Sequence, residues 1–114
     1  MPPKKNPLRL NKLQLRTLAL AQVMAADETL SSRNDDTGEV TLLQLPRPHG
    51  NHVHIGRFVV SARDVSGFTN PAVWKALERK ELARAEDALT IVITSTGVEY
   101  DTGLSDRFLT PSDH

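Results

Sequence analysis

Residues 61–82 read SARDVSGFTNPAVWKALERKEL, and this stretch decides the fold that the sequence predicts. The hydroxyl of Ser61 is suited to capping a short helix, which Gly67 is expected to end. Asn70 is a suitable cap for a second helix, and Pro71 fits its first position because the N–H that proline lacks has no partner there. The stretch therefore predicts two helices joined by a tight turn, and we expect the second to run to about residue 84.

A longer helix is predicted upstream, over residues 11–26. Apolar side chains recur every three or four residues from Leu13 to Met24, which places them on one face of a helix. Asn11 is a suitable N-cap. A second apolar strip widens the buried arc, so we expect this helix to be largely buried.

A β-hairpin is predicted over residues 39–60. The segments 39–45 and 53–60 are rich in β-branched and apolar residues, and a turn cluster with two prolines and a glycine separates them. Residues 27–38 are polar and rich in turn formers, which predicts a loop. The hairpin carries apolar side chains on both faces, and a chain of this length cannot cover them all. We therefore expect a homodimer that forms through the hairpin.

Three stretches of the sequence resemble parts of a known family. Leu77-Glu-Arg-Lys-Glu-Leu82 resembles the Leu-Glu-x-Lys-Gly-Leu that ends the recognition helix of MarR-type transcriptional regulators, with Glu81 in the place of the glycine. Ile93-Thr-Ser-Thr-Gly97 resembles the Leu-Thr-Pro-x-Gly that closes their wing, and residues 10–18 are similar to their first core helix. The resemblance covers residues 10–26 and 58–100.

The resemblance implies an α+β fold of the winged helix-turn-helix type, with an additional β-hairpin between the first helix and the helix-turn-helix. The expected parts then follow in order along the chain. They are a flexible basic arm (1–10), a winged-helix-like domain (11–100) that contains the hairpin (39–60), the helix-turn-helix (61–84) and the wing (85–100), and an irregular acidic tail (101–114).

In that family the third helix enters the major groove of double-stranded DNA. Carried over to this chain, the resemblance implies that Lys75 and Arg79 point outward from this helix, with Asn70 near its start and Arg63 reaching a phosphate. The alternative is that these charges are an ordinary solvated helix face. Trp74 is interpreted either as a core residue or as the anchor of a protein-interaction adaptor, which is the alternative function.

The net charge is zero, with 14 basic and 14 acidic residues, but the charges are segregated along the chain. Residues 1–26 carry five cations and no acid, and residues 40–84 have an excess of four cations. The two remaining blocks are acidic, and the acids Glu86 and Asp87 fall at the expected tip of the wing. Such acids weaken the case for DNA, because phosphate binding requires cations. Only five aromatic residues are present, which argues against a stacking platform for single strands.

Three histidines, His49, His52 and His54, lie close together in the sequence. Alternate residues of a strand share one face, so the last two are placed to bind one metal ion, with the first within reach from the turn. No acidic residue is close to them in sequence. We therefore expect no metal and keep a histidine-based metal site as the second alternative.

The sequence predicts no enzyme and no cofactor. Cysteine is absent, which excludes disulfides, thiol catalysis and thiolate-bound zinc. Phosphate-cradling glycine loops, nucleophile elbows and metalloprotease motifs are also absent. There is no apolar run long enough to span a membrane and no recognisable signal peptide, so we expect a cytoplasmic protein.

Overall fold

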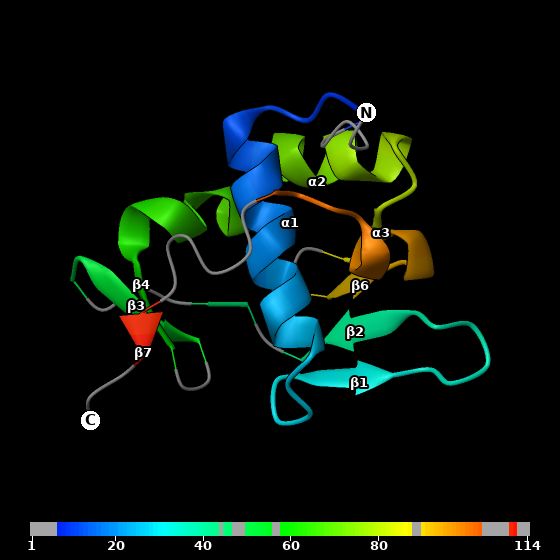
Figure 1. Ribbon diagram of the computed structural model, residues 1–114, viewed down its shortest axis with the longest axis horizontal. Coiled ribbons are helices and arrows are strands. Elements are labelled where there is room, and N and C mark those ends of the chain that lie inside the picture. The colour runs from blue at the N-terminus through cyan, green and yellow to red at the C-terminus, as the bar shows by residue number, and fades with distance from the viewer. Residues whose placement is uncertain are drawn as a thin grey trace.

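The computed structural model describes residues 7–43, 45–46, 50–55, 58–87, 90–103 and 110–111, and its fold is mixed α+β. A central helix, α1, runs between two antiparallel sheets, and α2 crosses near its N-terminal end (Figure 1). The helices are α1 (Lys12–Ala25), the 3₁₀-helix η1 (Ala62–Thr69), α2 (Pro71–Arg79) and α3 (Ser95–Glu99). The strands are β1 (Ser31–Arg33), β2 (Val40–Leu42), β3 (His52–Ile55), β4 (Phe58–Ser61), β5 (Ala83–Ala85), β6 (Ile91–Ile93) and β7 (Thr110–Pro111).

Helix α1 confirms the prediction for residues 11–26. It begins at a capping box, in which the Asn11 side chain accepts from the backbone N–H of Gln14 at 2.8 Å and the Gln14 side chain accepts from that of Asn11 at 3.0 Å. Leu18 and Leu20 are fully buried. The helix is thus held at its start by its own side chains and along its length by the apolar core on either side.

The larger sheet has the order β1-β2-β6-β5, and this order corrects the predicted hairpin over residues 39–60. Strand β2 does not pair with the segment that follows it. It lies between β1 and β6, with Val40 opposite Ile93 and Leu42 opposite Ile91. Strand β1 falls in the segment that was predicted to be a loop, because backbone pairing with β2 stabilises even the polar Ser31–Arg33.

The smaller sheet has the order β3-β4-β7. The apolar run expected to form one strand over 53–60 instead contributes to two strands that pair with each other, with Val53 opposite Val60 and both side chains buried. The tail was predicted to be irregular, but Thr110–Pro111 extend this sheet as β7. A hairpin does precede η1, but it lies within residues 52–61 and is separate from β2.

Helices η1 and α2 follow the predicted caps. The Ser61 hydroxyl accepts from the backbone N–H of Arg63 at 3.3 Å, and the Asn70 side chain accepts from that of Ala72 at 3.0 Å. Gly67 packs so closely on α1 that a Cβ there would collide with the Thr17 hydroxyl. The need for a close approach explains the glycine better than a helix stop, because η1 continues for two residues beyond it.

Helix α2 ends at Arg79, and the prediction that it runs to about residue 84 is wrong. The backbone N–H of Leu82 donates to the Leu77 carbonyl and that of Glu81 to the Glu78 carbonyl, both at 2.9 Å. This is the Schellman arrangement, in which the residue after the cap takes a left-handed conformation. Glu81 takes it, with φ 61°. The chain then turns back and enters β5.

Helix α3 joins the end of the fold to α1. The Gln22 side-chain amide donates to the backbone carbonyls of Gly97 at 2.9 Å and Tyr100 at 2.7 Å. The Tyr100 hydroxyl accepts from the backbone N–H of Leu8 at 3.0 Å. A Cβ at Gly97 would collide with the Leu82 carbonyl, so only glycine fits there.

The apolar residues of the predicted hairpin are mostly covered within one chain. Val40 and Leu42 are fully buried, and Leu45 packs partly against the core. Leu43 is 57% exposed, and among the described residues it is the one large apolar side chain that is exposed. The homodimer therefore stays a prediction, with Leu43 as its main remaining support.

In the part of the chain that the structure describes, no helix has the length and apolar character needed to cross a membrane.

Candidate nucleic-acid interface

Helix α2 presents one face to the core and the other to solvent. Val73, Ala76 and Leu77 are buried. Lys75 and Arg79 are exposed, four residues apart, and line one shallow depression together with Ala72 and Glu78. No ion pair with another described residue engages either Lys75 or Arg79. The predicted outward direction of these two side chains is confirmed.

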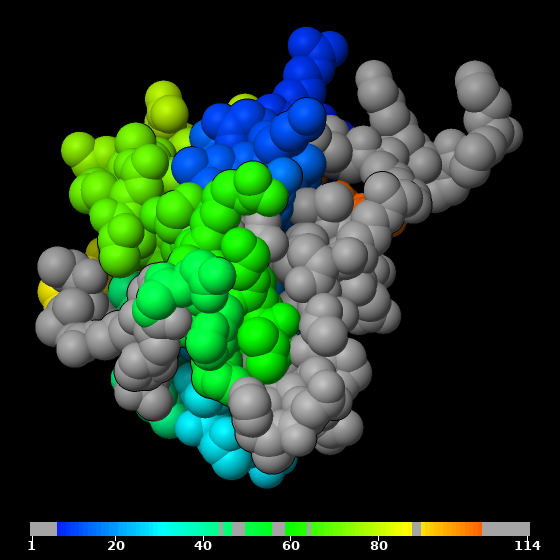
Figure 2. Space-filling model, turned by 90° about the vertical axis from the view of Figure 1, so that its left-hand side faces the viewer, coloured from blue at the N-terminus to red at the C-terminus, as the bar shows by residue number. Residues whose placement is uncertain are grey.

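The segments beside α2 carry further exposed cations. The start of α1 and helix η1 both pack near α2, and the space-filling view shows the three surfaces side by side (Figure 2). Arg9 and Lys12 are exposed at the start of α1, and Arg63 is exposed on η1. We call Arg9, Lys12, Arg63, Lys75 and Arg79 the basic face. Arg63 lies near the end of η1 that adjoins β4, so it flanks this face rather than joining its centre.

Asn70 is brought to the start of α2, as predicted, but its side-chain oxygen is occupied. It caps the helix by accepting from the Ala72 N–H, and the residue is half-buried. The side-chain amide nitrogen of Asn70 is the group that could contact DNA. The primary role that the geometry gives Asn70 is therefore to fix the start of α2.

Trp74 is a core side chain with 6% of its surface exposed. Its indole Nε1–H donates to the Phe68 carbonyl at 3.0 Å, and its ring packs edge-on against Phe68 with centroids 5.6 Å apart. Of the two interpretations of Trp74, burial supports the core residue. A protein partner would meet little of the ring.

Strands β5 and β6 form the segment predicted to be the wing, and an ion-pair cluster joins it to β2. Arg84 contacts the Glu39 carboxylate at 2.7 Å and the Glu86 carboxylate at 3.2 Å. The hydrogen bond from Arg84 is the largest cause that lowers the pKa of Glu39, and the same contacts raise the pKa of the guanidinium. Asp87 accepts from the Thr90 hydroxyl at 3.3 Å. Glu86 at the wing tip is thus partly offset by Arg84, which it shares with Glu39.

Arg84 and Glu78 also hold this part of the fold together, and neither contact was predicted from the sequence. Arg84 finds its partner 45 residues away, which no local pattern indicates. The Glu78 carboxylate accepts from the backbone N–H of Ala85 at 2.6 Å and so ties α2 to β5. The turn at Glu81 makes this contact possible, because it brings β5 back beside α2. A helix that continued to residue 84, as predicted, would not allow the contact.

Two of the three candidate metal-binding histidines lie together on β3. The rings of His52 and His54 meet edge to face, with centroids 5.2 Å apart. They share one strand face, as the period of two predicts, while Val53 and Ile55 point into the core. His49 lies outside the described residues. Within the described ranges, no group of three histidine or acidic side chains is placed to hold a metal ion.

Comparisons with protein-family models, with curated proteins and with solved structures found no match to this chain.

Proposed function

We propose that this chain is a divergent winged helix-turn-helix protein that binds double-stranded DNA and regulates transcription. The order of the elements supports this assignment: apart from β1 and the β3–β4 hairpin, the chain passes from α1 through β2, η1 and α2 to β5 and β6, that is, a helix, a strand, two helices and a strand pair. The pairing supports it further, because β2 adds to the β5–β6 pair through β6. The β3–β4 hairpin is then an insertion between β2 and the two helices.

The observation that carries the DNA proposal is the pair of unengaged cations on the exposed side of α2. Lys75 and Arg79 lie one helical turn apart, which suits contacts to neighbouring phosphates or to a guanine edge. Arg9 and Lys12 are further exposed cations at the start of α1, the end near which α2 crosses. Each cation that meets a phosphate releases condensed counterions, and this release supplies most of the affinity for duplex DNA.

The acidic wing is a smaller obstacle than its composition indicates. Glu86 pairs with Arg84, which offsets part of its charge, since Arg84 is shared with Glu39. Asp87 is the second acid of the β5–β6 connection, and its carboxylate accepts a hydrogen bond from the Thr90 hydroxyl at 3.3 Å. Such carboxylates near the wing tip weaken phosphate contact without abolishing it.

Binding to a generic duplex tests the proposal directly. We expect measurable binding at about 50 mM salt and a plot of log affinity against log salt with a slope of about −4 if most of the basic face is used. Lys75→Ala and Arg79→Ala should each weaken binding roughly tenfold and reduce the slope by about one. Fluorescence anisotropy with a labelled duplex over a salt series measures both quantities.

The matched control is Arg33→Ala, which removes an exposed cation from β1, on the opposite side of the molecule from α2 (Figure 1). This variant should keep the affinity and slope of the unchanged protein. Equal losses in all three variants would indicate a diffuse charge effect and contradict an interface on α2. Absence of binding at low salt would overturn the DNA proposal.

The protein-interaction alternative has less support, because the side chain expected to anchor it is buried and already hydrogen-bonded. This alternative predicts that the protein does not bind the duplex at low salt. It also predicts that Lys75→Ala and Arg79→Ala bind the partner protein as the unchanged protein does. The histidine-based metal alternative rests on the paired rings of β3. It predicts stoichiometric metal that His52→Ala removes.

A further inference from the structure

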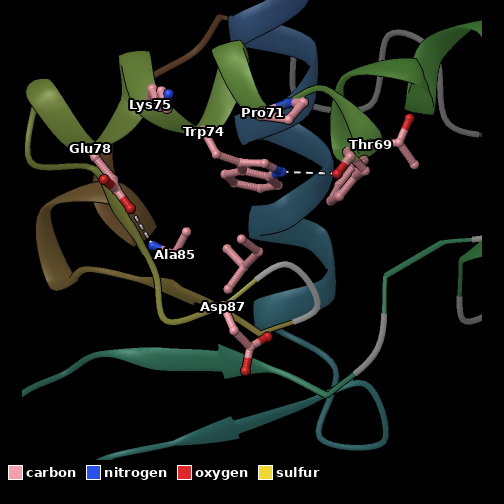
Figure 3. A pocket seen from close by; sticks show the side chains of 9 residues that line it. Thr69, Pro71, Trp74, Lys75, Glu78, Ala85 and Asp87 are labelled. Carbon is pink, nitrogen blue, oxygen red and sulfur yellow. Dashed lines mark hydrogen bonds between the residues drawn. The ribbon is translucent and has the colours of Figure 1, made fainter.

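A pocket of about 390 Å³ lies between α2 and the β5–β6 pair, on the side of Trp74 that faces the sheet (Figure 3). Phe68, Trp74 and Ile91 form its apolar walls, and Lys75, Glu78 and Asp87 are the charged residues that line it. Its size falls within the range of small-molecule sites, which are typically apolar with a few convergent polar groups. Neither the fold nor the DNA proposal requires such a pocket.

The walls of the pocket are held in place by contacts that do not involve a ligand. The indole N–H of Trp74 is fixed by the Phe68 carbonyl, and the two rings pack edge to face. The Glu78 carboxylate is fixed by the Ala85 N–H at 2.6 Å, drawn as a dashed line in Figure 3. A pocket with fixed walls needs little ordering when a ligand enters, which favours binding.

The charges of the pocket select the kind of ligand. The charged residues of the described lining are two carboxylates, Glu78 and Asp87, and one ammonium group, Lys75, so this lining carries a net negative charge. The Glu78 carboxylate accepts one hydrogen bond from the Ala85 N–H, and a carboxylate has about four acceptor sites. It can therefore accept from a ligand as well. An aromatic wall beside carboxylates is the combination that attracts organic cations.

We propose that this pocket binds a small organic cation with an apolar body, such as an aromatic or alkyl ammonium compound. The apolar part packs against Trp74 and Ile91, and the cationic head lies toward Glu78 and Asp87. The proposal does not depend on DNA binding, and its test contains no DNA. Failure of either proposal is therefore distinguishable from failure of the other.

The test uses Trp74 as its reporter, because it is the one tryptophan of the chain. Benzyltrimethylammonium is titrated into the full chain, and phenylacetate, an anion with a similar aromatic body, is titrated in parallel. We expect a saturable change in tryptophan fluorescence and a shift of the single indole N–H signal in NMR with the cation. The anion should bind much more weakly.

Charge variants locate the site. Glu78→Gln keeps an oxygen for the Ala85 N–H, and Asp87→Asn keeps the shape of the side chain, so both should fold. Each should weaken binding of the cation roughly tenfold, whereas Lys75→Gln should strengthen it. Glu28→Gln, which removes an exposed carboxylate from the loop after α1, is the matched control and should change nothing.

Three results would overturn the proposal. They are no saturable response to benzyltrimethylammonium at millimolar concentration, equal affinity for phenylacetate, and unchanged affinity in both Glu78→Gln and Asp87→Asn. If a variant fails to fold, its circular dichroism spectrum reveals this. The preference for the cation over the anion in the unchanged protein still decides the proposal.

Discussion

Single residues with a local partner could be predicted from the sequence. Asn11, Ser61 and Asn70 all cap helices, because a capping side chain binds a backbone N–H two or three residues along the chain. Glu81 could not be predicted in this way. Its left-handed backbone, with φ 61°, reverses the chain after α2, but glutamate gives no signal for that conformation.

Glu81→Gly is expected to stabilise the protein by about 0.5–1 kcal/mol. A non-glycine residue in the left-handed region costs about 1–2 kcal/mol, while glycine adds roughly 0.5–1 kcal/mol of flexibility to the unfolded chain. Urea unfolding measures the difference. Lys80→Gly is the control, since Lys80 has φ −92° and should lose stability on the same change. A less stable Glu81→Gly variant would contradict the strain at this residue.

At the scale of elements, helices were easier to predict than strand pairs. Helices α1 and α2 follow from nearby caps and periodicity, whereas β2 pairs with β6 about fifty residues later. Three-residue strands such as β1 carry too little pattern to be recognised. The resemblance to the regulators implied that the cations of α2 point outward, and they are exposed, but the pocket beside them depends on the distant β5–β6 pair.

The contact between β5 and the start of β2 should make stability depend on pH through Glu39. Because Arg84 holds the pKa of Glu39 below its ordinary value of 4.5, the folded state gains stability while the carboxylate is ionised. This gain is complete above about pH 4.5 and is lost as the pH falls through the lower pKa of the folded protein. The Glu39→Gln variant lacks this gain in stability at every pH.

The measurement is urea unfolding of the unchanged protein and of Glu39→Gln from pH 7 to pH 3. The gap in the free energy of unfolding should be largest near neutral pH and should close in acid. Since the pair is exposed, the gap is expected to be small. A gap that stays constant with pH would contradict the role of the Glu39 charge.

At the scale of the whole molecule, α1 lies between the two sheets: it packs on the larger sheet and on η1, and η1 in turn packs on the smaller sheet. One continuous core covers most apolar side chains within one chain. Predicting the class α+β required only the order of helical and strand segments. Predicting two separate sheets would have required knowing which strands meet, and that depends on packing around α1 rather than on any local pattern.

The exposed side chain of Leu43 predicts self-association, which can be measured. A stable dimer buries about 1,200 Å² or more, and Leu43 alone supplies a small part of that area, so we expect weak association in the micromolar range. Sedimentation equilibrium should give a mass that rises above 12.6 kDa with concentration. Leu43→Glu should remain monomeric, while Thr96→Glu on α3 should behave like the unchanged protein. A monomer at every concentration would contradict the predicted homodimer.

The hydrogen bonds from Gln22 to Gly97 and Tyr100 can form only after the ribosome has added these two acceptor residues. Gln22 precedes its first acceptor by 75 residues, which at translation rates of about 5–20 residues per second is roughly 4–15 s. During that interval α1 has been made but the last elements that pack on it have not. Helix α1 is therefore synthesised well before the elements that complete its enclosure.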